Sequence, residues 1–341
     1  MPVCDFLTMY IQYLKGESNN DSFISDNFYA LRDTEKNLLF SKELAIRHLD
    51  LLKEDISDIQ YEKEDSHILL FYTHGKKPYI AKIRFDKEGK INSITEDIYR
   101  ADEKMMVLVV EYDGSSYFGV QKQPRTNEIT IQDEIEKALL KMTKKEVIIT
   151  AASRTDRGVH AKGQVVQFDS MGIPASNYLS SLNDYLPKDI RVKNAYTRSQ
   201  LFNCRYDVER KTYEYIIDMG DYSVFNKDYV AYYQVNNISR MREELKSLIG
   251  THDFFSFSKG DKEDTVRTIY DASIHLNQDR LYLTFVGDGF LHNMIRLIVG
   301  SLLDIDKTGE GSIKVILDSK DKKLTSHMAP ASGLYLLRIN Y

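Results

Sequence analysis

Cysteine is scarce in this chain of 341 residues. The two cysteines, Cys4 and Cys204, stand far apart in the sequence, so they form neither a disulfide framework nor a metal-binding cluster by themselves. A secreted, disulfide-stabilised domain is therefore excluded, and a reducing cytoplasm is the expected location.

Long apolar runs are also missing. None approaches the roughly 20 residues that a membrane-spanning helix needs, so no membrane partner is expected. Residues 1–15 are fairly apolar but carry Asp5 where a secretory signal has a positive region, and we interpret them as a helix of the folded protein. The eight histidines do not stand at metal-ligand spacing with cysteines or carboxylates, and no phosphate-binding glycine loop occurs. Neither a metal nor another cofactor is expected.

The net charge of −5 weakly disfavours a polyanionic partner, because nucleic-acid-binding proteins commonly carry a basic surface. The acidity is unevenly distributed. The first hundred residues contain 14 Lys and Arg against 18 Asp and Glu, which leaves 32 against 33 for the rest. The larger part of the chain is thus nearly neutral and can still present a basic cleft.

The length predicts two or three units. Residues 1–102 read as an accessory α+β domain, whose role the sequence does not reveal. An apolar helical start is followed by a second helical stretch at 41–53 and by four strand-like runs, at 56–63, 67–73, 79–85 and 91–99. The short turns between these runs predict an antiparallel meander. Helices on a curved meander are loosely similar to the nuclear-transport-factor-like domains, and a small accessory domain of another kind is the alternative.

From residue 103 the pattern becomes an α/β body of two similar halves, 103–210 and 211–341. Apolar runs predict strands at 106–112, 147–150, 164–168, 212–217, 272–276, 281–286 and 335–339. Helical spacing of apolar residues predicts helices at 131–142, 178–182, 241–249 and 292–303. No low-complexity linker or tandem repeat separates the halves.

The loop from Arg154 to Ala161 carries the strongest chemical signal. Its sequence, Arg-Thr-Asp-Arg-Gly-Val-His-Ala, places one carboxylate among two arginines and a histidine. Neighbouring cations favour the ionised carboxylate, so they predict a lowered pKa for Asp156. An ionised Asp suits nucleophilic or base chemistry at a sugar carbon. Without further support, a solvated ion pair is the commoner explanation of such a residue.

This loop resembles the catalytic loop of the tRNA pseudouridine synthase A (TruA) family, which usually reads Gly-Arg-Thr-Asp-Ala-Gly-Val-His-Ala. Further segments resemble that family in the same order, from about residue 105 to the last residue. They are 112–123, 163–168, 182–192, 202–206 with 211–215, 250–257, 289–296 and 329–336. One such match can arise by chance, whereas eight in order are highly specific.

The resemblance implies a fold and an activity. The fold is α+β, with two ferredoxin-like halves forming one extended antiparallel sheet and the active cleft between them. The activity is isomerisation of uridine to pseudouridine in tRNA, at positions 38 to 40 of the anticodon stem-loop, by a homodimer. Asp156 would attack C1′ of the uridine or abstract the C2′ proton to give a glycal; both routes break the N-glycosidic bond and let the base return through C5.

The resemblance also implies roles around Asp156. Tyr213 would stack on the uracil and help to remove the C5 proton, Arg296 would pair with Asp156 and keep it ionised, and Leu334 would pack against the base. From the residues alone, Tyr213 and Leu334 are better explained as core side chains and Arg296 as a surface charge on a helix.

Cations in the motif loops are candidates for RNA contacts. A base within structured RNA must be extruded before reaction, and Arg154 is the candidate to fill the vacated space, with a plain loop arginine as the alternative. Phosphate contacts that position an RNA are expected from Lys122, Arg125, Arg205, Arg210 and Lys211. Scattered surface cations are the commoner explanation for any one of them.

His160 is expected to be structural or substrate-orienting rather than a general base. The chain departs from the family at Val120, Arg157 and Asn293, where Trp, Ala and a second His are common. Arg157 adds a cation beside the carboxylate and is expected to lower its pKa further or to alter which stem-loop fits. Two alternatives stay open: a synthase redirected to another RNA site, and a noncatalytic RNA-binding module.

Overall fold

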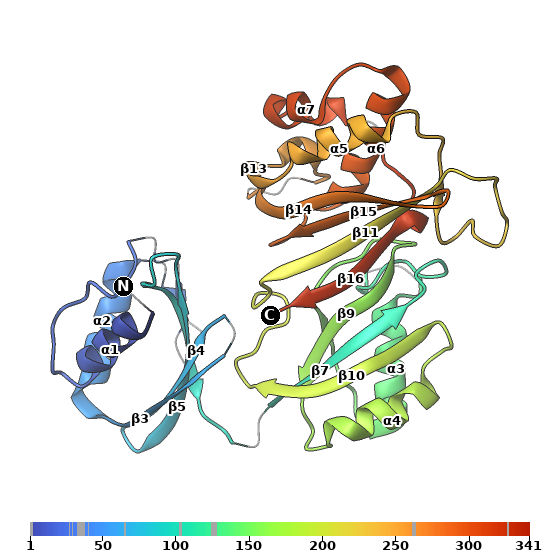
Figure 1. The fold of residues 1–341 in the computed structure, drawn as a ribbon. Coiled ribbons are helices and arrows are strands. Elements are labelled where there is room, and N and C mark those ends of the chain that lie inside the picture. The colour runs from blue at the N-terminus through green and yellow to red at the C-terminus, as the bar shows by residue number, and fades with distance from the viewer. Residues whose placement is uncertain are drawn as a thin grey trace. The chain divides into compact units, whose positions relative to one another are not determined.

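The computed structural model describes residues 3–26, 28, 30–32, 38–39, 41–64, 66–101, 104–123, 128–260, 264–325 and 327–341. Arg125, a candidate phosphate contact, lies outside these residues. The chain forms two compact units (Figure 1). The accessory unit comprises Met1–Met105 with Arg198–Phe202, and the body comprises Met106–Thr197 with Asn203–Tyr341.

The accessory unit consists of two helices and a six-stranded sheet. The helices are α1 (Val3–Leu14) and α2 (Lys42–Leu52). The strands are β1 (Ala30–Arg32), β2 (Leu38–Leu39), β3 (Ile56–Lys63), β4 (Ile68–His74), β5 (Lys77–Phe85) and β6 (Ile91–Ile98), in the order β2-β1-β6-β5-β4-β3. Strands β3 to β6 pair antiparallel in chain order, which confirms the predicted meander. The short β1, which was not predicted, adds parallel to β6.

Local sequence explains why the helices pack on this sheet. At the start of α2, the Ser41 side chain accepts a hydrogen bond from the Leu44 amide, which satisfies a backbone donor that the helix leaves free. Ala45, Leu49 and Leu52 recur at helical spacing and are buried. They join a core with buried residues of α1 and of the meander. Both helices therefore cover the same face of the sheet (Figure 1).

The body is built on a ten-stranded sheet. Its main path runs β10-β7-β9-β16-β11-β15-β14-β13, while β8 pairs with β9 and β12 pairs with β11. The bounds are β7 (Lys104–Tyr112), β8 (Thr150–Ala151), β9 (His160–Asp169), β10 (Ile190–Ser199), β11 (Arg210–Asp218), β12 (Ala231–Tyr232), β13 (Gly250–Asp253), β14 (Val266–Asn277), β15 (Arg280–Gly287) and β16 (Leu334–Asn340).

The sheet is mixed, so the expectation of a wholly antiparallel sheet was wrong. Strand β16 pairs parallel with β9, at Tyr335 with His160 and Leu336 with Ala161, and β12 pairs parallel with β11. Hairpins force neighbouring strands to be antiparallel, but β9 and β16 are joined by a long stretch of chain, so no turn constrains their direction. The closing strand β16 thereby lies between β9 and β11 and joins strands from early and late in the body.

In the described part of the body, α-helices cover the sheet in two groups (Figure 1). They are α3 (Ile131–Thr143), α4 (Ala175–Tyr185), α5 (Ile238–Lys246), α6 (Met294–Thr308) and α7 (Ile313–Ser319). Helix α3 contacts α4, whereas α5, α6 and α7 contact one another. One continuous apolar core includes buried residues from both groups and from the sheet. None of the helices in the described part of the chain is long and apolar enough to cross a bilayer.

Candidate active site

The loop that carries Asp156 connects β8 to β9, which pair antiparallel. It turns back on itself where the Val159 amide donates to the Asp156 carbonyl at 3.1 Å. Gly158 has a φ of +76°, a left-handed conformation that favours glycine. The sequence therefore builds a tight turn that begins at the carboxylate.

A second loop, residues 113–120, packs its backbone directly on this turn. The Val120 amide donates to the Thr155 carbonyl at 3.2 Å, and the Gly158 amide donates to the Tyr117 carbonyl at 3.4 Å. A Cβ atom at Gly119 would lie 2.6 Å from the Thr155 carbonyl oxygen, so only glycine permits this approach. Two motif segments that are distant in sequence thus form one rigid unit.

Two side chains that precede Asp156 are anchored by tyrosine hydroxyls. Ser153 Oγ lies 2.7 Å from the Tyr213 hydroxyl, and Thr155 Oγ1 lies 2.7 Å from the Tyr112 hydroxyl. The Gln164 side chain donates to the Ser153 carbonyl at 2.8 Å. Burial raises the pKa of Tyr112 to about 12, so both hydroxyls stay protonated and able to donate. The stretch of chain that leads into Asp156 is therefore held by two fixed side chains.

Arg296 and His292 contact different oxygens of the Asp156 carboxylate. Arg296 Nη1 lies 3.7 Å from Oδ2, and His292 Nε2 lies 3.4 Å from Oδ1. Arg296 is fixed in turn, because its Nε donates to the Ala329 carbonyl at 2.8 Å and its Nη1 donates to Asn293 Oδ1 at 3.2 Å. The structure thus brings together Asp156 and Arg296, which the sequence had paired only through the family resemblance.

The pKa of Asp156 is raised, so the expected lowering was wrong. Burial of the carboxylate raises the pKa, and the positive charges of His292, Arg296 and Lys259 oppose that effect only in part. The loop arginines are not among these cations. Arg154 is exposed, and Arg157 places its guanidinium 4.0 Å from the centre of the Phe118 ring. Both arginines are close to Asp156 in sequence. The side chain of Arg154 points to solvent, however, and that of Arg157 points to an aromatic ring.

Tyr213 and Leu334 both lie in the core beneath the site. Tyr213 is 6% exposed, and its ring meets the Phe290 ring edge-on at 5.2 Å. Its hydroxyl is engaged with Ser153, and burial raises its pKa. Leu334 begins β16 opposite Tyr215 on β11 and is buried. The structure therefore supplies packing roles for both residues and leaves their contact with a base as a prediction.

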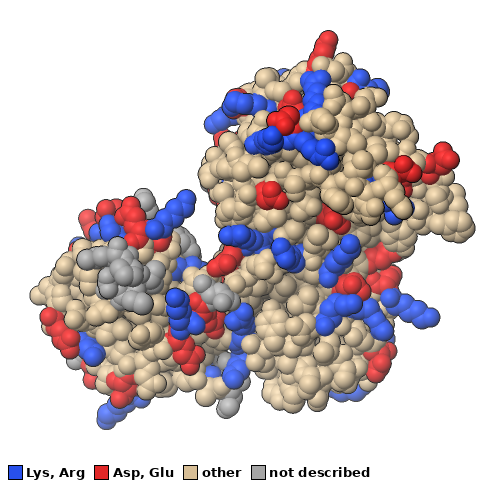
Figure 2. Space-filling model, in the orientation of Figure 1, with Lys and Arg blue, Asp and Glu red and all other residues tan. Residues whose placement is uncertain are grey.

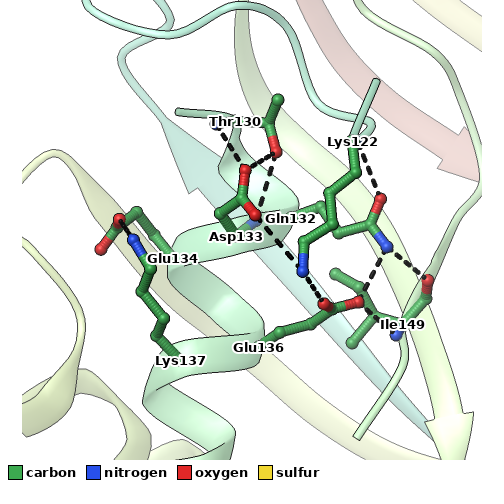
Figure 3. A network of polar contacts seen from close by, with 8 residues as sticks. All are labelled: Lys122, Thr130, Gln132, Asp133, Glu134, Glu136, Lys137 and Ile149. Carbon is green, nitrogen blue, oxygen red and sulfur yellow. Dashed lines mark hydrogen bonds and ion pairs between the residues drawn. The ribbon is translucent and has the colours of Figure 1, made fainter. Parts of the chain in front are cut away.

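The candidate RNA contacts differ in how strongly they are already engaged. Lys122 Nζ lies 2.5 Å from Glu136 Oε2 and 3.3 Å from Asp133 Oδ1, in the network of Figure 3. Arg205 Nη2 donates to the Ala151 carbonyl at 3.4 Å. Arg154 is exposed and makes no hydrogen bond or ion pair within the described part of the chain. Arg154 therefore has the most freely available charge of the three.

Charge on the visible face of the body is mixed. Figure 2 shows Lys and Arg interspersed with Asp and Glu, so positive charge on this face occurs in small groups. Lys211 adds a further cation near the loop, since its Nζ donates to the Ala152 carbonyl at 3.0 Å. Arg210 lies with its guanidinium 4.9 Å from the centre of the Tyr270 ring.

His160 holds several segments together. Its Nδ1 accepts from the Gly114 amide at 3.1 Å, and its Nε2 donates to the Asp228 carbonyl at 2.8 Å, which assigns the proton to Nε2. Its ring stacks on Tyr335 at 4.7 Å. Burial lowers the pKa of His160, so the neutral form is favoured. Both ring nitrogens are thus engaged, as expected for a structural residue.

Sequence reasoning missed two cations near Asp156. His292 stands four residues before Arg296 in one motif, so the spacing could have suggested a shared target. Lys259 comes from a different segment and carries no such signal; its amide donates to the His292 carbonyl at 3.1 Å. Among the described residues, no group of His, Cys, Asp and Glu side chains is arranged to hold a metal ion.

The departures from the family pattern are accommodated locally. Val120 is fully buried in the core and supplies the amide that reaches Thr155. Asn293 precedes α6 with a φ of +61°, a left-handed conformation that asparagine tolerates better than most residues. The same residue accepts the hydrogen bond from Arg296.

Comparisons with known proteins identify relatives of the body. A family model described as tRNA pseudouridine synthase matches residues 108–207 and 245–341. A protein of Exiguobacterium sp. named tRNA pseudouridine synthase A is 42% identical over 240 residues, covering 69% of this chain and 96% of that protein. Its namesake in Bacillus subtilis is 40% identical over 241 residues, covering 68% of this chain and 97% of that protein.

A solved structure titled "Crystal Structure of a Cbf5-Nop10-Gar1 Complex" matches with a TM-score of 0.27 and 9% identity, covering 68% of this chain and 58% of that chain. That score is too low to support an argument about the fold. The sequence relatives match about as much of this chain as the body contains.

Proposed function

The chain belongs to the tRNA pseudouridine synthase family, and from this premise we propose that it isomerises uridine to pseudouridine in tRNA with Asp156 as the reacting carboxylate. The observation that carries the proposal is a single carboxylate, one-quarter exposed, on a braced loop between two cations. A carboxylate so placed can reach a substrate and is still favoured in its ionised form by its neighbours.

The reaction exchanges one bond for another within the nucleotide. Asp156 attacks C1′, or removes the C2′ proton to give a glycal, and the bond between C1′ and N1 breaks. The base rotates and forms a bond from C5 to C1′; in the first route this breaks the bond between Asp156 and C1′, and in the second Asp156 returns the proton to C2′. C5 then loses its proton and N1 gains one. Tyr213 is proposed to lie under the uracil, Leu334 to pack beside it, and Arg296 to keep Asp156 ionised throughout. Tyr213, Leu334 and Arg296 come from β11, β16 and α6, so these roles draw on elements outside the loop.

Arg154 is proposed to fill the space that the extruded base leaves. Its exposure and its lack of partners within the described residues support this role, because an already engaged side chain would have to break contacts first. Arg205 and Lys122 stay candidates for phosphate contacts. Lys122 is the weaker candidate, since two carboxylates already balance its charge.

Several finer assignments are proposed, some from the family resemblance and some from the sequence pattern and the cysteine content. They are modification of uridines 38 to 40, a homodimer in a reducing cytoplasm, two ferredoxin-like halves in the body divided near residue 210, and a nuclear-transport-factor-like accessory unit. The parallel pairing of β1 with β6 and the helix-covered meander are compatible with the last of these. The buried, unpaired Cys204 is compatible with a reducing compartment.

The proposal is tested with unmodified tRNA tritiated at uracil C5. Wild-type protein is expected to release tritium, and Asp156→Asn to lose at least about 1,000-fold in rate, since the amide is neither a nucleophile nor a base. An equal rate for the variant would remove Asp156 from its role. If neither protein releases tritium although both still bind tRNA, the noncatalytic RNA-binding module is favoured.

The position is tested separately by mapping pseudouridines in RNA from a strain that lacks this protein. Loss at positions 38 to 40 is the expected result. If these sites stay modified while another site is lost, the protein is a synthase redirected to that other RNA.

A further inference from the structure

His292 is the one exposed side chain in direct contact with the Asp156 carboxylate among the described residues. Its side chain is 61% exposed, whereas that of Arg296 is 12% exposed. Because His292 buries little surface, its presence is not explained by packing. Its Nε2 lies 3.4 Å from Oδ1, on the oxygen that Arg296 does not contact.

The backbone of His292 is fixed from two directions. Asn293, the next residue, adopts the left-handed conformation that starts α6, and the His292 carbonyl accepts the Lys259 amide. Lys259 follows the 3-10 turn Phe255–Phe257, so a separate segment of the body holds the His292 backbone. From this backbone the side chain reaches Asp156 while it stays largely exposed.

The distances indicate how the carboxylate is held. Charge-assisted hydrogen bonds between nitrogen and a carboxylate are usually about 2.7–2.9 Å long. Both cations of this site lie farther away, at 3.4 and 3.7 Å. The carboxylate is therefore oriented by charge from two sides, while its oxygens keep lone pairs that can react.

We infer that His292 is a positioning residue for the proposed reaction: its imidazole, when protonated, holds Oδ1 while Arg296 holds Oδ2, so that Asp156 meets the sugar in one orientation. The inference rests on the proposed function of Asp156. It assigns His292 to the chemical step, so its removal must slow the reaction of bound tRNA rather than weaken tRNA binding. It also requires the charge, so a different cation must replace the imidazole better than a neutral side chain does.

The experiment measures single-turnover tritium release at saturating enzyme, together with the dissociation constant for the same tRNA. The variants are His292→Gln, which is neutral, and His292→Lys, which keeps a cation. His275→Gln is the matched control, because His275 is an exposed histidine on β14 whose ring contacts Tyr282 rather than the loop. Thermal unfolding of each variant verifies that the fold is intact.

The expected result is a rate about tenfold lower for His292→Gln, a dissociation constant within about twofold of wild type, and recovery of most of the rate in His292→Lys. His275→Gln should match wild type. A wild-type rate for His292→Gln, a loss confined to tRNA affinity, or a Lys variant as slow as the Gln variant would each overturn the inference.

Asp156→Asn, measured in parallel, separates the two proposals. If Asp156→Asn is inactive and His292→Gln reacts at the wild-type rate, only the role of His292 fails. If Asp156→Asn releases tritium at the wild-type rate, the proposed function is wrong, and the role of His292 that depends on it is wrong as well.

Discussion

Two carboxylates, one in each unit, are held in opposite ways. In the accessory unit, the Glu96 side chain is 1% exposed; its Oε1 accepts from the Tyr72 hydroxyl at 3.0 Å, and its Oε2 lies 2.7 Å from His48 Nε2. In the body, Asp156 is 25% exposed and has cations at 3.4 and 3.7 Å. Glu96 is saturated by short contacts, while Asp156 is oriented but left accessible.

The difference teaches how to separate a structural acid from a reactive one. Short hydrogen bonds to both oxygens satisfy a buried carboxylate, and burial keeps other partners away from its remaining lone pairs. An acid for chemistry must keep a free lone pair and a route to solvent, at some cost in stability. Each prediction below changes one side of this comparison.

Replacement of Arg296, the more buried of the two side chains that contact the Asp156 carboxylate, should lower the reaction rate more than the other changes below. Arg296→Gln takes away a charge that opposes the raised pKa of Asp156, so that pKa should rise further. Asp156 reacts when ionised, so the rate falls as pH drops through its pKa. The wild-type acidic limb should lie above the ordinary aspartate value of 3.8, and the variant limb should lie higher still.

The check is a pH series of single-turnover rates. At neutral pH we expect a loss of roughly 100-fold for Arg296→Gln. Arg338→Gln, which removes an exposed arginine on β16, serves as the control. An unchanged acidic limb in Arg296→Gln would contradict the assignment of that limb to Asp156.

Disruption of the structural acid should affect stability and spare chemistry. Glu96→Ala leaves the Tyr72 hydroxyl and the His48 ring without their acceptor in a buried site, so unfolding of the accessory unit should become easier by about 2 kcal/mol. Glu96→Gln, which keeps an acceptor oxygen, should cost less. Urea unfolding measures the stability, and a large fall in tritium release for a folded Glu96 variant would break the comparison.

Replacement of the exposed Arg154 should weaken tRNA binding more than replacement of Lys122, which is already paired with carboxylates. Arg154→Met should weaken binding by about fivefold or more, because a free guanidinium is lost, and the salt dependence of binding should become shallower. Lys122→Met should change binding by less than about twofold, since Glu136 and Asp133 already balance that charge. Titration of labelled tRNA at several salt concentrations distinguishes them; the reverse ranking would show that RNA recruits Lys122 from its network.

Removal of the Tyr213 hydroxyl, which contacts Ser153, should have the smallest effect of these changes. Tyr213→Phe removes the contact to Ser153 and should cost about 1 kcal/mol of stability with a rate loss of only a few-fold. Tyr213→Leu should be slower, because the aromatic ring is lost as well. Single-turnover rates of the two variants provide the test. If Phe is as inactive as Asp156→Asn, the hydroxyl takes part in proton removal from C5.

Regular, strongly apolar elements were predictable from sequence. The run 56–63 is found as β3 with the same bounds, and the helix expected at 131–142 is α3, which ends one residue later. The strand expected at 147–150 overlaps β8 (Thr150–Ala151) only at Thr150, and residues 147–149 lie in the loop before that strand. Strand β10 was missed, since its polar residues alternate with few buried ones and give a weak pattern.

By itself, the sequence predicted a separate N-terminal unit and singled out the loop around Asp156, because motifs and apolar periodicity are properties of consecutive residues. Only the tertiary structure decided the environment of Asp156. Burial sets the direction of its pKa shift. The charges that oppose that shift come from Arg296 on α6, from His292 two residues before that helix and from Lys259, not from the loop. Distances between such segments are fixed by packing, which the order of residues along a loop does not encode.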